Sequence, residues 1–319
     1  MAVEVALRQA TTEDARAAAR LLIAAFPHLP VTARRVRERL SEPVPNESAR
    51  HLAAMDGDRL VGWCRSRLEV ETGEPGHGQV TLAVAPQYRG RGIGTALLTD
   101  AELHLAAAGA ATLHSATLED EPTRQFCSRR GWLPSRWSRF LSLDLTPLAD
   151  VDPPVPPDGV TVTPAWMLDD LRSLYQAHAE CIQDEPRELP AAPLAYEHWL
   201  DDVWRAPGHD PTAGTVVLVG GQVVSFALFD VDRGSGRIWS GMTGTRRGWR
   251  GRGLAALAKA AALQRAAERG LRTAWTANHT QNAQMAAVNE RLGYRLAVTQ
   301  VSLVRHLPLL GATGPIPLP

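Results

Sequence analysis

The chain has 319 residues, which corresponds to about two domains at roughly 150 residues each. Its 34 basic side chains balance its 34 acidic ones, and this argues against a dedicated binder of nucleic acid or of an acidic membrane. A composition that is 45% hydrophobic and 21% charged is typical of a folded globular protein. Lys259 is the only lysine, which we interpret as a compositional bias.

The same order of elements is predicted twice along the chain. Each half begins with a strand and two helical stretches, continues with three strands, and then alternates helix, strand, helix and strand. We therefore expect a mixed α/β (α+β) fold in which a mostly antiparallel, twisted sheet is flanked by helices. The expected segments of the first half are 5–8, 15–25, 33–40, 51–55, 59–68, 79–84, a helix that contains 93, 97 and 101 and ends before Gly109, 111–116, a helix that ends at Gly131, and 140–143. Those of the second half are 160–162, 168–181, 195–204, 215–219, 222–229, 238–243, a helix that ends before Gly270, 273–276, a helix that ends at Gly293, and 295–304.

An internal repeat explains this order. The octamer QYRGRGIG at 87–94 recurs as GWRGRGLA at 248–255, so that Gly90 and Gly251 are 161 residues apart. The same offset joins Gly109 to Gly270, each at the end of an alanine-rich segment. The sequence therefore predicts a tandem duplication: an N-terminal domain over 1–146, a proline-rich linker over 147–158, a C-terminal domain over 159–308 and a flexible tail over 309–319.

The cysteines and the termini limit the location of the protein. Cys64, Cys127 and Cys181 are odd in number, far apart and without CxxC spacing, which disfavours disulfides and a metal site. The first ten residues lack the apolar stretch of a signal peptide, and no run of about 18 apolar residues exists. We expect a cytoplasmic protein with neither membrane nor nucleic acid as partner, and a monomer whose two halves pair internally.

The glycine-rich turn of each half is the strongest functional signal. A strand that enters such a turn before a helix forms an anion site, because the helix N-terminus presents unpaired N–H groups and glycine allows close approach of the backbone. Arginines in the turn can add charge-assisted bonds to phosphate oxygens. The expected ligand-binding residues are Val84, Arg89, Gly90, Arg91, Gly92, Ile93 and Gly94 in the first half, and Thr243, Thr245, Arg250, Gly251, Arg252, Gly253, Leu254 and Ala255 in the second.

Three phosphate-binding motifs compete for this turn. The NTPase loop needs a Gly-Lys-Ser/Thr ending, which is absent, and the dinucleotide motif needs glycine where Thr95 and Ala256 stand. The third motif, Q/R-x-x-G-x-G/A, is complete at 87–92. With the preceding Val-Ala-Pro, it resembles the coenzyme A pyrophosphate loop of the GNAT acetyltransferase superfamily. The second copy departs from the motif at Gly248, where the first has Gln87.

A later segment, 276–294, resembles the strand–helix motif of the same superfamily. In that motif an asparagine near Asn282 bonds the pantetheine arm, and we add Asn278 to this set. The resemblance implies transfer of an acyl group, usually acetyl, from acetyl-CoA to a primary amine by direct attack on the thioester. It also implies that a backbone N–H near Val84 or Thr245 polarises the thioester carbonyl.

The catalytic residues depart from the family pattern. Many members have a tyrosine as general acid four residues before the last glycine of the motif, where this chain has Cys127 and Asn289. We expect Asn289 to hydrogen-bond the sulfur or a water. The carboxylates of Asp230 and Asp232, repeated as Glu69 and Glu71, are candidates to bind the amine or accept its proton. The alternative reading is that they are solvated charges at a hairpin tip.

Two classes of function remain open. The first is a tandem acyltransferase acting on the amine of a small metabolite or antibiotic, with a protein N-acetyltransferase as a weaker variant. The second is a non-catalytic acyl-CoA-binding or regulatory protein, which the missing tyrosines favour. If the chain is an enzyme, we expect the second half to be active. Its Asn282 can donate to pantetheine, whereas Asp120 at the matching position of the first half cannot.

Overall fold

The computed structural model describes residues 5–42, 44–70, 75–184, 194–206, 208–278 and 282–307. The chain forms two compact units: unit 1 comprises Met1–Trp137 with Thr299–Pro319, and unit 2 comprises Ser138–Val298. Among the described residues, no helix has both the length and the apolar character needed to cross a membrane. The tail predicted over 309–319 lies outside the described residues.

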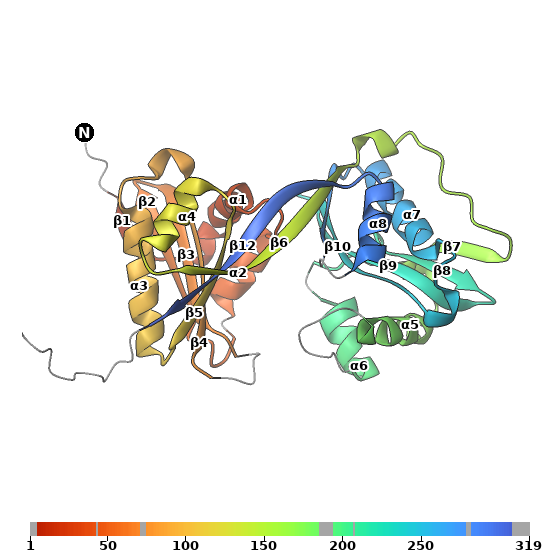
Figure 1. The fold of residues 1–319 in the computed structure, drawn as a ribbon, viewed down its shortest axis with the longest axis horizontal. Helices are drawn as coiled ribbons and strands as arrows, with labels where there is room; N and C mark the ends of the chain where they lie inside the picture. Colours follow the sequence, from red (N-terminus) through yellow and green to blue (C-terminus); the bar gives the residue numbers. More distant parts are fainter. Residues whose placement is uncertain are drawn as a thin grey trace, which may run out of the picture. The chain divides into compact units, whose positions relative to one another are not determined.

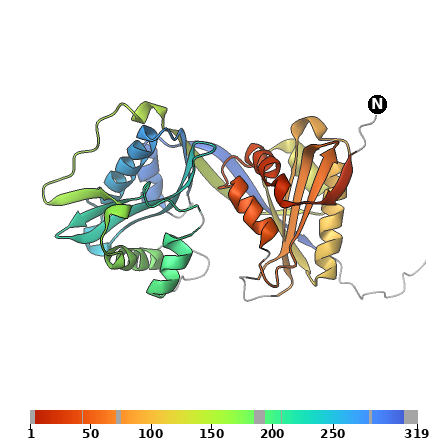
Figure 2. The ribbon, with the colours of Figure 1, turned by 180° about the vertical axis from the view of Figure 1, so that it is seen from behind.

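Unit 1 has a sheet with the strand order β1-β2-β3-β4-β5-β12. Neighbouring strands are antiparallel except β4 and β5, which are parallel. Helices α1 and α2 pack against each other on one face (Figure 2), and α3 covers the other. In chain order, residues 6–144 form β1 Ala6–Gln9, α1 Ala15–Ala25, α2 Ala33–Ser41, β2 Arg50–Asp56, β3 Arg59–Leu68, β4 His77–Val84, α3 Ile93–Ala107, β5 Thr112–Leu118, α4 Glu121–Ser128 and β6 Leu133–Asp144, and β12 is Arg295–His306.

Unit 2 repeats this arrangement with the strand order β7-β8-β9-β10-β11-β6, where only β10 and β11 are parallel. Helices α7 and α8 lie on one face of its sheet and α5 and α6 on the other (Figure 1). The elements are β7 Val160–Pro164, α5 Arg172–Gln183, α6 Tyr196–Trp199, β8 Thr215–Val219, β9 Gln222–Asp232, β10 Arg237–Thr245, α7 Leu254–Glu268, β11 Thr273–Asn278, α8 Ala283–Arg291 and β12 Arg295–His306.

The long alanine-rich helices form because small side chains recur on one face. In α7, Ala258, Ala262 and Ala266 are all buried, at the i, i+4, i+8 spacing of a helix face. Both α3 and α7 end before a glycine with positive φ, Gly109 at 92° and Gly270 at 78°, as the sequence predicts. The two units therefore confirm the predicted mixed α/β class with mostly antiparallel sheets.

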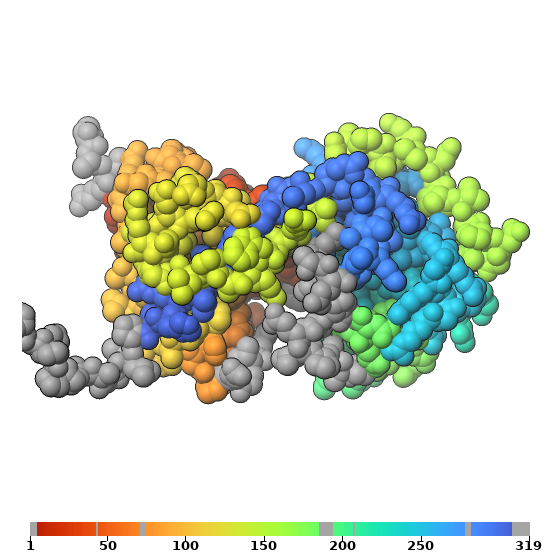
Figure 3. All heavy atoms as spheres, viewed as in Figure 1, coloured from red at the N-terminus to blue at the C-terminus, as the bar shows by residue number. Residues whose placement is uncertain are grey.

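The last strand of each unit comes from the other half of the sequence. Residues 139–144 of β6 pair with β11 in unit 2, and residues 300–306 of β12 pair with β5 in unit 1. In Figure 3 the dark blue C-terminal residues lie against yellow and orange segments of unit 1. The units therefore differ from the predicted contiguous domains, 1–146 and 159–308. The alternating apolar pattern of a strand fixes which face is buried, but it does not specify the neighbouring strand.

This exchange predicts how two leucines on one strand should behave. Leu303 is 6% exposed in the core of unit 1, whereas Leu296, earlier on β12, is 55% exposed. We expect Leu303→Ala to lower the unfolding free energy of unit 1 by about 2–5 kcal/mol. Leu296→Ala should change stability by about 0.5 kcal/mol or less. Hydrogen exchange of the β2–β5 amides against the β8–β10 amides measures the two units separately. Faster exchange in unit 2 alone for Leu303→Ala would contradict the exchange of strands.

Candidate active site

Both units carry the same turn between a strand and a helix. Just before α3 and α7, Gly92 has a φ of 83° and Gly253 a φ of 76°, in the left-handed region that favours glycine. No side chain caps either helix, so the first N–H groups of each helix have no acceptor within it. A Cβ built on either glycine would meet no atom within 4 Å. Each turn therefore offers backbone donors to an anion in open space.

One arginine of each turn donates a hydrogen bond to the end of the strand that precedes the turn. Arg89 Nε donates to the carbonyl of Val84 at 3.2 Å, and Arg250 Nε donates to the carbonyl of Thr245 at 3.0 Å. The second arginine of each turn lies over the aromatic ring three positions earlier, at 5.2 Å in unit 1 and 4.7 Å in unit 2. These contacts hold the four arginines beside the turn and fix its shape.

A gap opens between two strands next to each turn. Strands β10 and β11 pair only over Arg237–Trp239 with Thr273–Trp275, and both then continue without pairing to each other. In unit 1, β4 and β5 likewise pair only over His77–Gln79 with Thr112–His114. Beyond the last pair, the strands present backbone donors and acceptors to the gap, where an extended ligand with amide groups can bond to them.

Only the gap of unit 2 is bordered by a bulge. The β9–β10 register shifts between Ser240 and Thr243, whereas the β3–β4 ladder runs without a shift. Such a bulge turns backbone groups away from the ladder. The Thr243 hydroxyl is buried and has no hydrogen-bond partner among the described residues, whereas the Thr245 hydroxyl lies 2.8 Å from that of Ser225. An unpaired buried hydroxyl is costly unless a ligand or water bonds to it, so this wall fits a polar ligand.

In unit 1, side chains of α4 and of the residues just after it pack on the first turn of α3. The Phe126 ring lies 3.4 Å from a Cβ built on Gly94, in the first turn of α3. Arg130 stacks on Phe126 at 3.9 Å and donates to the Thr95 hydroxyl. Ser115 on β5 donates to a β4 carbonyl at 2.8 Å. The first turn of α3 is therefore covered by side chains that unit 2 lacks.

Asn282, which we predicted to contact pantetheine, and Asp120 at the matching position of the first half are both helix caps. Asn282 Oδ1 accepts from the Met285 N–H at 3.0 Å, and Asp120 Oδ1 accepts from the Thr123 N–H at 3.0 Å. Capping uses one oxygen of each side chain, so the Asn282 amide group keeps its N–H donors while Asp120 offers none. Asn278 ends β11, and its side chain lies outside the described residues.

The three predicted catalytic residues do not form one cluster. Asp232 belongs to the β9–β10 turn, where it accepts from the Gly234 N–H at 3.1 Å and the Ser235 hydroxyl at 2.5 Å. Asp230, two positions earlier, shares its face of the sheet. Asn289 is fully buried on α8, on the α7 face. The i, i+2 spacing in β9 does not show that Asp232 accepts hydrogen bonds within the β9–β10 turn. Glu71, of the matching pair Glu69 and Glu71, lies outside the described residues.

A histidine that the sequence did not single out lies beside Asp230. His209 forms an isolated β-bridge with Asp230, and its ring packs 5.4 Å from that of Trp204. Burial lowers the pKa of His209, although the Asp230 carboxylate opposes this shift. Burial therefore favours the neutral form of this imidazole, and its Nε2 has no hydrogen-bond partner among the described residues.

Carboxylates at the end of α5 engage the turn of unit 2. Asp184 accepts two bonds from Arg247, at 2.8 and 2.9 Å, and one from Arg250 at 2.5 Å. Glu180 accepts from the Arg247 N–H at 2.6 Å and from Arg246 Nε at 2.9 Å. The hydrogen bonds from Arg247 and Arg250 hold the pKa of Asp184 well below its usual range. Asp184 therefore offsets positive charge at the place where an anion would bind.

The only lysine of the chain is buried in unit 2. Lys259 Nζ donates to Asn289 Oδ1 at 2.6 Å and lies 4.9 Å from the centre of the Tyr294 ring. Burial lowers the pKa of Lys259 to about 7. We call Lys259, Asn289 and Tyr294 the Lys259 cluster. Its members are 30 and 35 residues from Lys259 in the sequence, so no local pattern joins them.

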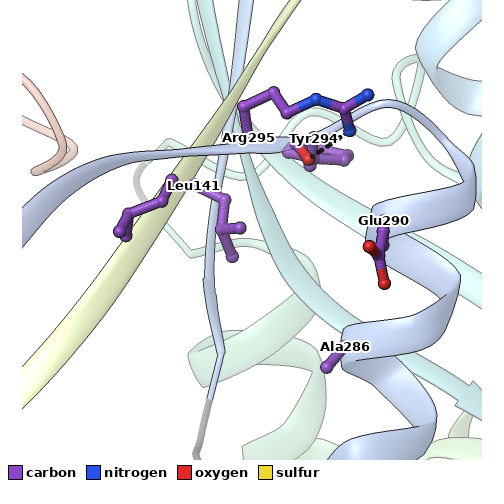
Figure 4. A pocket seen from close by; sticks show the side chains of 6 residues that line it. Leu141, Ala286, Glu290, Tyr294 and Arg295 are labelled. Atoms are coloured by element: carbon purple, nitrogen blue, oxygen red, sulfur yellow. Dashed lines mark hydrogen bonds between the residues drawn. The ribbon is translucent and has the colours of Figure 1, made fainter.

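A cavity of about 400 Å³ opens beside this cluster (Figure 4). Arg295 donates to the Tyr294 carbonyl there at 3.1 Å. Within the described residues, no group of three or more histidine, cysteine or acidic side chains has the arrangement of a metal site. The cavity is lined by Leu141 of β6, Ala286 and Glu290 of α8, and Tyr294, Arg295 and Leu296.

Comparison with known proteins agrees with this geometry. The model of the acetyltransferase (GNAT) family matches residues 13–132 and again 170–294. A mycothiol acetyltransferase of Streptomyces scabiei is 29% identical over 261 residues, covering 78% of each chain, and one of Tsukamurella paurometabola is 46% identical over 88 residues, covering 27% of this chain and 28% of the relative.

Solved structures share the fold. A tandem GNAT protein from the clavulanic acid biosynthesis pathway aligns with a TM-score of 0.70 at 23% identity, covering 95% of this chain and 98% of that one. A GCN5-related N-acetyltransferase from Sphaerobacter thermophilus aligns with a TM-score of 0.65 at 21% identity, covering 95% of both. With two matches of one family model over most of its length, the chain belongs to the GNAT family of acetyltransferases and contains the family's domain twice.

Proposed function

We propose that the protein transfers the acetyl group of acetyl-CoA to a primary amine of a small molecule, and that unit 2 carries out the reaction. The observation that carries this proposal is the open turn before α7 next to a gap with an unpaired buried hydroxyl at Thr243. The relatives named mycothiol acetyltransferases support a small-molecule acceptor.

The residues of unit 2 fit the parts of coenzyme A in order. The N–H groups of Gly253, Leu254 and Ala255 would hold the pyrophosphate at the start of α7. The unpaired edges of β10 and β11, with the Asn282 amide, would bond the pantetheine arm. The carbonyl of the thioester would accept from a backbone N–H at the β10 bulge, where the strand turns away from β9.

Acetyl-CoA supplies an acetyl group activated as a thioester, and the chain must supply a base for the amine. Asp230 remains our candidate, and His209 lies beside it through a β-bridge. Asp232 is less suited, because its oxygens already accept bonds within the β9–β10 turn. The leaving sulfur would lie toward Asn289, at the position of the missing family tyrosine.

Unit 1 better fits a supporting role. Its turn has the same backbone geometry, but Phe126 packs against Gly94 and Arg130 bonds Thr95 at the start of α3. The screen that tests the enzyme proposal supplies acetyl-CoA with a panel of amine metabolites and antibiotics and measures thiol release. Turnover with any amine supports transfer. Tight coenzyme A binding without turnover on any amine would favour the binding-protein alternative.

Calorimetry on variants of the turn glycines shows how many coenzyme A sites the protein has. We expect Gly253→Trp to abolish binding in unit 2, because the indole would fill the open space and the residue would be held at a φ of 76°. Gly92→Trp should remove only a site in unit 1, if that site exists. Gly270→Trp is the matched control, since Gly270 has a φ of 78° at the far end of the same helix. Calorimetric binding that is unchanged in Gly253→Trp and Gly92→Trp would reject both sites.

The charge of Asp184 provides a second test of the turn. We expect Asp184→Asn to tighten coenzyme A binding several-fold, because Arg247 and Arg250 lose the carboxylate that competes with phosphate. The gain should shrink as salt is raised. Asp201→Asn, which breaks an exposed pair with Arg205, serves as the control and should leave affinity unchanged. Weaker binding in Asp184→Asn would instead mean that the carboxylate orients the arginines for the ligand.

Asn282 distinguishes the two units. Asn282→Asp keeps a helix-capping oxygen but loses the amide donors, so we expect α8 to stay folded while the KM for acetyl-CoA rises about fivefold to tenfold, the value of one hydrogen bond. Asp120→Asn makes the opposite change at the matching position of unit 1 and should leave the KM for acetyl-CoA unchanged. Steady-state kinetics with the best amine of the screen measures both. If only Asp120→Asn alters the KM, unit 1 is the active one.

A further inference from the structure

A surface loop of unit 1 buries a single carboxylate. In residues 44–49, which we call the Glu47 loop, Val44 is 48% exposed and Asn46 and Ser48 are exposed, whereas Glu47 is 5% exposed. Asn46 has a φ of 65° and Ser48 a φ of 45°, and among the described residues these are the two non-glycine positions with positive φ. The backbone on both sides of Glu47 therefore has an unfavourable conformation, which the contacts of the buried carboxylate must offset.

Two arginines of β3 hold this carboxylate. Glu47 Oε2 accepts from Arg65 at 3.0 Å, and Glu47 Oε1 accepts from Arg67 at 3.1 Å. The two arginines are two residues apart on the strand, so their side chains lie on the same face of the sheet, which α1 and α2 cover. Arg67 also bonds to Glu69 at 2.9 Å and to Gln79, the last β4 residue paired with β5, at 3.0 Å. Glu47 therefore bridges two guanidinium groups beside the gap of unit 1.

Donors next to this carboxylate are left without an acceptor. Arg65 Nε is buried and has no hydrogen-bond partner among the described residues. His51, which pairs with Arg65 across β2 and β3, is 5% exposed, and neither of its ring nitrogens has a partner in the described part of the chain. Burial, together with the charge of Arg65, lowers the pKa of His51 to about 4, so the ring is neutral at pH 7 and keeps one N–H. These donors fit a ligand with more oxygen atoms than the Glu47 carboxylate has.

Unit 2 folds without this group of charges. The Leu68 N–H donates to the Glu47 carbonyl at 2.6 Å, and at the same place in unit 2 the Val231 N–H donates to the Gly208 carbonyl at 2.9 Å. The two bonds align β3 with β9 two residues beyond the 161-residue offset of the glycine turns. Unit 2 then has Gly208, Leu228 and Asp230 where unit 1 has Glu47, Arg65 and Arg67. The fold therefore does not need a buried ion pair at this place, and the sign of the charge on the strand is reversed between the units.

We propose that Arg65 and Arg67 form a binding site for a small organic acid in unit 1, and that the Glu47 side chain is its built-in ligand. When the Glu47 loop opens, the two guanidinium groups lose this carboxylate, which destabilises the open form. A free carboxylate stabilises the open form because it accepts the same charge-assisted bonds. The spare donors of Arg65 and His51 can bond to a further oxygen of that molecule. Binding of the acid therefore displaces the Glu47 loop, and the site is separate from the coenzyme A turns.

Removal of the built-in ligand tests the site. Glu47→Ala opens space beside the arginines, so sodium acetate should stabilise this variant relative to sodium chloride at the same ionic strength. Acetate at about ten times its dissociation constant should raise the folding equilibrium constant about elevenfold, because a ligand of the folded state contributes the factor 1 + [L]/Kd. Glu38→Ala is the matched control: it removes an exposed partner of Arg34, and the two salts should affect it as they affect the native chain. Equal unfolding midpoints of Glu47→Ala in acetate and chloride would overturn the proposal.

Hydrogen exchange in the native chain provides a test that needs no variant to fold. The Leu68 amide donates to Glu47 in the closed loop, so its exchange reports the opening of the loop. We expect this amide to exchange faster in acetate than in chloride, because acetate binds the open form. The Val231 amide, which bonds to Gly208 in unit 2, is the internal control and should exchange equally in both salts.

The same measurement identifies the outcomes that contradict the proposal. Equal exchange of the Leu68 amide in acetate and chloride would overturn the displacement of the Glu47 loop. Faster exchange in inorganic phosphate, with no effect of acetate, would overturn the assignment of a carboxylate as the ligand. Neither test involves coenzyme A, so their results do not depend on whether unit 2 transfers acetyl groups.

Discussion

The pairing of each sheet with a strand from the other half of the chain is the constraint on which both units depend. The core of unit 1 contains Val301 and Leu303 of β12, and the half-buried Leu141 and Leu143 of β6 pack against the core of unit 2. Without these strands, β5 and β11 would become open edges with one face of apolar side chains unfilled. Neither half of the sequence therefore encodes a complete unit.

The sequence predicted the two similar domains but not the exchange of the strands β6 and β12 between them. The 161-residue offset and the glycine turn identify two similar domains, because a backbone that must approach an anion leaves glycine at fixed positions. The strand exchange left no such signal, since Phe140 and Val301 have the same alternation whichever sheet they join. For Asn282, the position just before a helix was itself a capping signal, and a ligand role and a capping role use different atoms of one amide.

The burial of Lys259 is difficult to predict from the sequence around it. A single lysine in an alanine-rich helix resembles a surface charge, and its partners lie 30 and 35 residues away across a strand and a turn. The signal available was the repeat itself: at the same offset the first half has Leu98, in a pattern where apolar residues face the core. The difference between the halves at this one position, Leu98 against Lys259, therefore indicates that the lysine faces the core.

The two units thus share a backbone and differ in the electrostatics of one gap. In unit 1, Arg130 and Phe126 cover the start of α3, and an apolar contact lies where unit 2 has its cluster. In unit 2, Asp184 holds Arg247 and Arg250 of the turn, and Lys259 donates to Asn289 in the core. A phosphate that binds at this turn competes with the Asp184 carboxylate for the two arginines. The same backbone turn therefore presents different charges to an anion in the two units, and the side chains around it, more than its glycines, decide how tightly an anion binds.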